Sequence, residues 1–150
     1  MPWIILAAII WLINLIFIRP SGIKKYWGAG IWSLLLGFFM TEALVIQNDI
    51  LFSNQVTFMV QGMPVAYLVG LAGFGLIIKC FLPVEKFWKL PYLIFLAAVL
   101  TWVEILFINN GYIITNQWSL YYSYLFKLIF LVSVAWLSHL TVREKRGFLF

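Results

Sequence analysis

Charged residues are scarce in this chain. They make up 10% of its 150 residues, whereas a soluble domain has about a quarter of its residues charged. Hydrophobic residues account for 65%, and the mean hydropathy is +1.03. A chain of this composition cannot cover its surface with polar groups, which excludes a water-soluble globular domain. The composition therefore predicts an all-α integral membrane protein with the lipid bilayer as its first partner.

Cysteine and histidine are almost absent, and each absence excludes a class of site. Cys80 is the only cysteine, so a disulfide framework and a cysteine-rich metal site are excluded. His139 is the only histidine, which excludes a two-histidine haem or a histidine-rich metal cluster within one chain. The glycines at 70, 73 and 75 are not a nucleotide-binding motif, because no strand–turn–helix pattern surrounds them. We therefore expect no metal and no cofactor.

Five apolar runs dominate the chain, at residues of about 3–18, 26–47, 64–82, 91–108 and 120–140. Each is long enough, or nearly so, to cross about 30 Å of hydrocarbon at 1.5 Å per residue. Pro64 and Pro91 would lie in the first turn of their helices, where proline is tolerated. A break is expected at residues 19–22, which contain Pro20 and Gly22. The pattern predicts a polytopic protein of five transmembrane helices, forming a single membrane domain over residues 1–150.

Basic residues lie on one side of this predicted membrane domain. Nine of the ten fall in the first and third connections, near their ends, or after the fifth helix: Arg19, Lys24, Lys25, Lys79, Lys86, Lys89, Arg143, Lys145 and Arg146. By the positive-inside rule, the N-terminus is outside and the C-terminus is cytoplasmic. The same placement explains the net charge of +5 without a nucleic-acid partner. We expect a multi-pass protein of the cell membrane, in bacteria the cytoplasmic membrane.

A stretch near the middle of the chain recurs sixty-two residues later. Residues 42–55 read EALVIQNDILFSNQ, residues 104–117 read EILFINNGYIITNQ, and six of the fourteen positions are identical. The alignment predicts one helix followed by two tandem hairpins, at about 25–82 and 86–140, related as in parallel-repeat transporters. The alternative is that helix ends favour Asn and Gln and that the matches arose by chance. The connections at 48–63 and 109–119 are rich in apolar residues, so we expect them to lie in the membrane interface or fold back over the bundle.

Three ionisable residues, Glu42, Glu104 and Lys127, lie in the outer half of the predicted spans. Charge inside a membrane is expensive, so such residues are functional candidates. Lys127 aligns with Val65 in the other repeat, so two carboxylates share one lysine. One carboxylate would pair with the lysine, and the other would be protonated or would bind a cationic ligand. Two interpretations stay open: a structural ion pair between Glu104 and Lys127, or an outward-facing ligand pocket lined by Glu42, Glu104, Lys127, Asn48, Asn110 and Gln117.

The segment TWVEILFINNGYIITNQWSLYYSYLFKL, at residues 101–128, resembles a family of small multi-spanning membrane proteins of spore-forming Firmicutes. In that family an intramembrane Glu is followed by a short loop, a Trp and a Tyr-rich final helix. The matching positions here are Glu104, Trp118 and Tyr122 or Tyr124. The resemblance covers the last four helices and implies the same topology and a role for Glu104. The family carries no assigned activity, so it implies no reaction.

Three functions are compatible with these features. The first is a non-enzymatic subunit or assembly component of a membrane complex, in which the chain packs with copies of itself or with a larger membrane protein. The second is a small transporter or ligand-binding membrane protein that uses the carboxylate pocket. The third is a lipid-modifying membrane enzyme, since paired carboxylates can perform acid–base chemistry. Short connections that leave no room for a soluble domain favour the first, and no catalytic residue is predicted.

Overall fold

The computed structural model describes residues 2–18, 20–53, 58–116 and 118–141. The described chain is helical apart from four short strands, which confirms the predicted helical class. Its helices are α1 (Pro2–Phe17), α2 (Pro20–Ile46), α3 (Val65–Phe81), α4 (Lys86–Asn109) and α5 (Leu120–Thr141). The strands are β1 (Ile50–Phe52), β2 (Met59–Val60), β3 (Met63–Pro64) and β4 (Ile113–Thr115).

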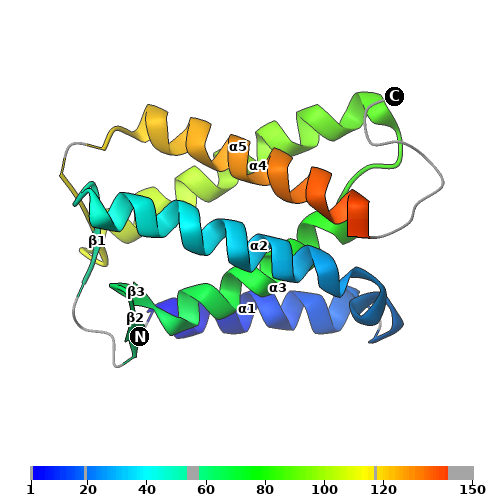
Figure 1. Cartoon of the computed structure of the whole chain (residues 1–150), viewed down its shortest axis with the longest axis horizontal. Helices are drawn as coiled ribbons and strands as arrows, with labels where there is room; N and C mark the ends of the chain where they lie inside the picture. Colours follow the sequence, from blue (N-terminus) through cyan, green and yellow to red (C-terminus); the bar gives the residue numbers. More distant parts are fainter. Residues whose placement is uncertain (1, 19, 54–57, 117, 142–150) are drawn as a thin grey trace.

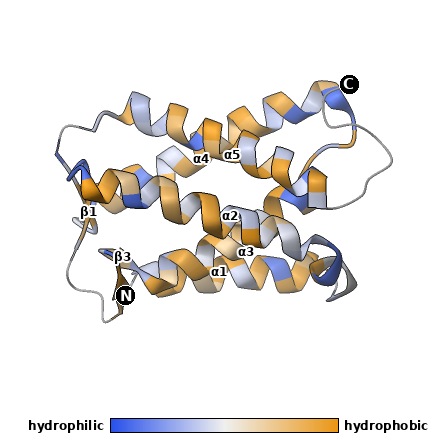
Figure 2. Ribbon diagram, in the orientation of Figure 1, coloured by the Kyte–Doolittle hydropathy of each residue, from blue (hydrophilic) through white to orange (hydrophobic). Residues whose placement is uncertain are grey.

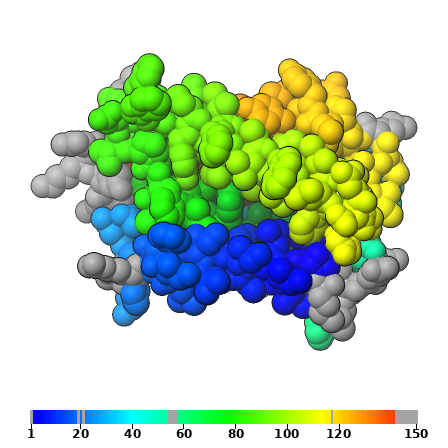
Figure 3. Space-filling model, turned by 180° about the vertical axis from the view of Figure 1, so that it is seen from behind, coloured from blue at the N-terminus to red at the C-terminus, as the bar shows by residue number. Residues whose placement is uncertain are grey.

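The five helices lie along the long axis of the molecule, with α3 at the centre (Figure 1). Helix α3 packs mainly against α2 and α1, while α5 packs against α2 and α4. On the face seen in Figure 3, α4 and α1 lie on either side of α3, which is visible between them. The four strands gather at one end of the bundle, here called the strand end. The α1–α2 and α3–α4 connections lie at the other, here called the opposite end (Figure 1).

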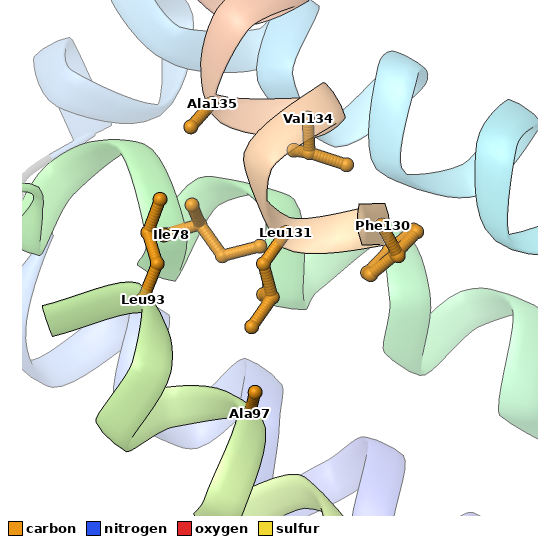
Figure 4. Close-up of a cluster of buried hydrophobic side chains, with 7 residues drawn as sticks. All are labelled: Ile78, Leu93, Ala97, Phe130, Leu131, Val134 and Ala135. Carbon is orange, nitrogen blue, oxygen red and sulfur yellow. The ribbon is translucent and has the colours of Figure 1, made fainter. Parts of the chain in front are cut away.

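Two clusters of buried apolar side chains hold the bundle together. The first joins α3, α4 and α5 through Ile78, Leu93, Ala97, Phe130, Leu131, Val134 and Ala135 (Figure 4). The second lies at the strand end and consists of Trp3, Leu44, Ile50, Phe52, Met63 and Ile113. Four members of the second cluster come from the two connections that are rich in apolar residues. Of the two predicted placements, packing against the bundle is the one found for these described residues.

Large apolar side chains are exposed on all five helices, for example Leu12, Phe39, Val69, Phe95 and Ile129. The ribbon coloured by hydropathy shows apolar residues along each helix (Figure 2). Among the described residues, three helical segments are long and apolar enough to cross a membrane: Gly22–Ile46, Lys86–Asn109 and Leu120–Thr141. The α4 helix is the most exposed of them, since only 17% of its apolar window is buried inside the molecule. Helices α1 and α3 are apolar too, but they have only 16 and 17 residues. The structure thus supports membrane association with three helices of spanning length.

Helices α2 and α3 approach each other closely because small residues face each other along their contact. A Cβ atom at Gly75 of α3 would overlap the backbone carbonyl of Ala29 on α2. One at Gly30 of α2 would come within 3.0 Å of the Ala72 carbonyl oxygen on α3. The Ser33 hydroxyl uses this proximity to donate a hydrogen bond of 2.7 Å to the Leu71 carbonyl oxygen. Small residues and hydroxyl-to-backbone bonds are the usual means of helix packing in membranes.

The strand end is built from two antiparallel pairs, β1 with β4 and β2 with β3. Helices α2 and α4 lead into β1 and β4 through the same type of cap. Asn48 (φ 57°) and Gly111 (φ 71°) take the left-handed conformation. In each cap this residue and the next donate backbone hydrogen bonds to carbonyls three and five positions earlier, which defines a Schellman motif. The short strands were not predicted, because each has only two or three residues.

Two predicted helix boundaries were wrong at the opposite end. Helix α2 begins at Pro20 and not near residue 26, so the predicted break does not extend to Gly22. Proline suits the first position of a helix, because its ring fixes φ and its missing N–H has no partner to lose there. Helix α4 begins at Lys86 and not at residue 91, so Pro91 lies inside the helix. The helix continues through Pro91, although proline has no N–H to donate to the Phe87 carbonyl. Only this one hydrogen bond is lost, about one turn from the start of the helix.

Candidate functional site

A closed triangle of polar side chains joins α4 to α5. The Lys127 ammonium donates hydrogen bonds to Oε2 of Glu104 at 2.5 Å and to Oγ of Ser123 at 2.6 Å. The Ser123 hydroxyl in turn donates to the same Glu104 oxygen at 2.5 Å. Glu104 is buried, with 8% of the residue exposed, and Ser123 is buried beside it. The structural ion pair between Glu104 and Lys127 is therefore present, with a serine as its third member.

Helical geometry explains how the triangle forms. Ser123 and Lys127 are four residues apart on α5, so their side chains lie on one face of the helix. Glu104 lies five residues before the end of α4, which is about 8 Å from the strand end by the helical rise. Because α4 and α5 pack against each other in antiparallel directions, Glu104 meets Ser123 and Lys127 near the strand end. Sequence reasoning missed Ser123, although its spacing from Lys127 was a usable signal.

The direction of the hydrogen bonds decides what the triangle can do chemically. A serine nucleophile with a lysine base needs a neutral amine that can accept the hydroxyl proton. Here the ammonium is the donor to both oxygens, so it offers no lone pair to the hydroxyl. The Ser123 hydroxyl donates to the Glu104 carboxylate, which the Lys127 ammonium also contacts. The hydrogen bonds of Glu104 with Ser123 and Lys127 link α4 to α5.

A second polar contact connects this region with α2 and α3. The hydroxyls of Thr41 and Tyr67 share a hydrogen bond of 2.9 Å. The Tyr67 ring packs edge-on against Trp3, with ring centroids 5.4 Å apart. Trp3 also contacts Phe52 and Phe107, at 5.2 Å and 4.5 Å. Sequence reasoning did not single out Thr41 or Tyr67.

Glu42 is in a different situation from Glu104. It lies four residues before the end of α2, about 6 Å from the strand end, and is half-buried. Among the described residues, no hydrogen-bond or ion-pair partner contacts its carboxylate. The neighbouring hydroxyl of Thr41 is already bonded to Tyr67. Within the described part of the chain, Lys127 is therefore paired with one of the two carboxylates, and the other has no partner there.

The amide side chains predicted to line the pocket are placed elsewhere. Asn48 and Asn110 are exposed, and both belong to the helix caps. The Asn110 side-chain amide donates a hydrogen bond to the Leu106 backbone carbonyl at 2.6 Å. The Asn116 side-chain amide donates one to the Asn48 backbone carbonyl at 2.7 Å. Neither is hydrogen-bonded to Glu104 or Lys127. Gln117 lies outside the described residues.

Two surface cavities lie outside the predicted pocket, and a metal site is not formed among the described residues. One cavity, of about 660 Å³, lies at the α3–α4 connection beside Trp88 and Tyr92. The other, of about 260 Å³, is an apolar groove between α1 and α2. Neither is lined by Glu42, Glu104 or Lys127.

The chain was compared with protein-family models, with curated proteins and with solved structures. No protein-family model, no curated protein and no solved structure matches the chain. The resemblance to the membrane proteins of spore-forming Firmicutes therefore stays a prediction. Fold and site together define a class: a helical protein with membrane-length apolar helices and a buried ion pair between two of them.

Proposed function

We propose that the chain is a multi-pass protein of the bacterial cytoplasmic membrane, with five transmembrane helices, and acts as a non-enzymatic subunit of a membrane complex. The N-terminus lies outside and the C-terminus lies in the cytoplasm. The direction of the helices supports this topology, because α1 starts at the strand end and α5 ends at the opposite end (Figure 1). Lys24, Lys25 and Lys86 also lie at the opposite end, as the positive-inside rule requires of a cytoplasmic face.

The two shorter helices are compatible with five spans. At 1.5 Å per residue, α1 and α3 are about 24 Å and 26 Å long, close to a hydrocarbon thickness of about 30 Å. Helix α3 packs against the longer α2, and α1 packs against α3. Strands β2 and β3 pair with each other directly before α3. The backbone N–H and C=O groups that form this pair are therefore satisfied near the membrane surface.

Two observations support a tandem repeat of the α2–α3 and α4–α5 pairs. Both first helices end in a Schellman motif followed by a short strand. The β1–β4 register pairs Leu51 with Ile114 and Phe52 with Ile113. In the repeat alignment Leu51 corresponds to Ile113 and Phe52 to Ile114. Leu51 therefore pairs with the counterpart of Phe52, and Phe52 pairs with the counterpart of Leu51. A two-fold axis relating two repeats would produce this exchange.

The observation that carries the non-enzymatic role is the closed triangle of Glu104, Lys127 and Ser123. A buried ion pair with satisfied hydrogen bonds holds two helices in one geometry and one register. Within it the Lys127 ammonium is a donor to both oxygens and does not serve as a base. A chain of five short-looped helices with such a link works by packing, and its exposed apolar side chains are available to lipid or to another helix.

A second candidate function is a small transporter or binding protein for a cationic ligand. It is favoured by one observation, the half-buried carboxylate of Glu42 that has no partner among the described residues. A permeating or bound cation would be attracted to such a group. The first function predicts a protein partner, whereas the second predicts a small molecule whose binding depends on Glu42.

Native mass spectrometry of the protein, extracted gently from its own membrane, separates these functions. A complex that contains a distinct second protein in fixed stoichiometry is the expected result. A monomer or homo-oligomer that carries a small molecule, lost in Glu42→Gln, would replace the subunit proposal with the binding proposal. Membrane-impermeant thiol labelling of single cysteines, introduced at Asn110 and at Lys86 in a Cys80→Ser background, tests the topology. The first should be labelled from outside and the second should not.

A further inference from the structure

An apolar groove runs along the outer face of the bundle where α1 and α2 are held apart by α3. Trp11 of α1 forms one wall, and Ile31 and Leu35 of α2 form the other. Ala72 and Leu76 of α3 form the floor together with Gly30. The groove has a volume of about 260 Å³ and belongs to the part of the molecule that would face lipid. Small residues on its floor let another helix approach the backbone closely.

Glu42 continues the wall of this groove toward the strand end. It follows Ile31 by eleven residues and Leu35 by seven, spacings that place all three on one stripe of α2. Leu35 and Glu42 are therefore about 10 Å apart along the helix. Exposed apolar residues at Phe39 and Ile46 flank the carboxylate on the same side. A helix lying in the groove and extending toward the strand end would reach Glu42.

The charge of Glu42 defines what such a helix must carry. Lys127 is the only lysine or arginine among the described residues near the strand end, and it is held by Glu104 and Ser123. A second copy of this chain would bring only the same occupied lysine. Its other described basic residues lie at the opposite end, at the wrong depth. Charge complementarity therefore favours a different protein over self-association.

We infer that the groove between α1 and α2 binds a transmembrane helix of a partner protein, and that a lysine or arginine in the outer half of that helix pairs with Glu42. The inference rests on the proposed subunit function and specifies the chemistry of its partner. Buried interhelical polar pairs in membranes have measured energies of about 1–2 kcal/mol in model peptides, which corresponds to roughly fivefold to thirtyfold in affinity.

Resonance energy transfer in phosphatidylcholine vesicles tests the inference with model helices. The protein carries a donor dye on Lys24→Cys in a Cys80→Ser background. Lys24 lies near the start of α2, at the opposite end of the bundle from Glu42. Two acceptor-labelled transmembrane peptides of leucine and alanine are compared, one with a lysine about 6 Å from its outer end and one with leucine there. We expect the lysine peptide to associate about fivefold or more tightly, and Glu42→Gln to reduce the ratio to about one.

Matched tryptophans provide the control for the groove itself. Trp27 lines the groove and Trp102 lies on α4, and each is 62% exposed. Trp27→Ala should weaken the association of both peptides, whereas Trp102→Ala should leave it unchanged. The inference is overturned if the two peptides bind wild-type protein equally, or if the preference for lysine survives Glu42→Gln. Self-association that depends on Glu42 and excludes the lysine peptide would overturn it in favour of a homo-oligomer.

Failure of this inference and failure of the subunit proposal give different results. If mass spectrometry finds a second protein but the lysine peptide has no advantage, the chain is a subunit and the partner binds elsewhere. If mass spectrometry finds the chain alone, the subunit proposal itself fails, whatever the peptides do. Glu42→Gln should retain the thermal stability of the wild type, so a loss of binding will not reflect a loss of fold.

Discussion

The two helix pairs α2–α3 and α4–α5 place a carboxylate at a similar distance from the strand end, yet they are joined in different ways. Glycine and serine bring α2 and α3 so close that a single Cβ at Gly75 would overlap the Ala29 backbone. Larger side chains such as Leu93 and Leu131 separate α4 from α5, and a buried ion pair bridges them. In one pair the carboxylate is used internally, and in the other it is left available.

This difference teaches that a buried charge and close backbone packing are alternative means of joining apolar helices. Without water, apolar side chains gain little by leaving lipid for each other, so specific contacts must supply the preference for one partner. The α2–α3 pair obtains them from backbone proximity and the Ser33 hydrogen bond. The α4–α5 pair obtains them from Glu104 and Lys127. Each pair can be broken at its own type of contact.

The largest effect is expected when one partner of the ion pair is removed. Lys127→Leu leaves the buried Glu104 carboxylate without its cation and should lower the free energy of unfolding by about 3 kcal/mol or more. Titration with sodium dodecyl sulfate, followed by tryptophan fluorescence, measures this. The double variant Glu104→Leu/Lys127→Leu removes both charges and should recover much of the loss. A double variant less stable than the single one would show that the pair does not act as a unit.

The next largest effect should fall on the close contact of α2 and α3. Gly75→Ala introduces a Cβ that must push the Ala29 backbone away, and should lower the free energy of unfolding by about 2.5 kcal/mol. Gly70→Ala on the same helix is the matched control, because its Cβ would lie 3.5 Å or more from its neighbours. The control should change stability by less than about 0.5 kcal/mol. Equal losses in both variants would mean that helix flexibility, and not close approach, explains the glycines.

A smaller effect compares one serine from each pair. Ser123→Ala removes hydrogen bonds to a carboxylate and an ammonium and should cost about 1.5 kcal/mol, because bonds to charged groups are the stronger ones. Ser33→Ala removes one bond to a backbone carbonyl and should cost about half as much. The same detergent titration measures both. A larger loss in Ser33→Ala would contradict the central role of the triangle in the α4–α5 pair.

The smallest effect on stability is expected at the unpaired carboxylate. Glu42→Gln removes a charge that makes no hydrogen bond among the described residues, so the free energy of unfolding should change by less than about 0.5 kcal/mol. The isosteric change at the other carboxylate, Glu104→Gln, should be much more harmful, because it leaves the Lys127 charge uncompensated. Comparable losses in the two variants would mean that Glu42 also has a structural partner.

Several features could be predicted because they depend on position along a helix. The rise per residue is constant, so the levels of Glu104 and Lys127 near the strand end followed from their places in two apolar runs. The structural interpretation of that pair needed only the further assumption that the two helices are neighbours. By contrast, the starts of α2 and α4 were missed, since Pro20 and Pro91 are compatible with more than one position near a helix start.

The sequence by itself determined the helical class, the apolar surface suited to lipid and the position of each ionisable side chain along its helix, because composition and helical periodicity act along the chain. Only the tertiary structure decided which carboxylate obtains the lysine, that Ser123 completes the link, and that Asn48 and Asn110 serve helix caps and not a pocket. The physical reason is that periodicity sets the height and the face of a side chain but not the helix it meets. That choice depends on which backbones can approach each other, and here Gly75 and Ala29 bring α3 against α2 while Glu104 meets α5.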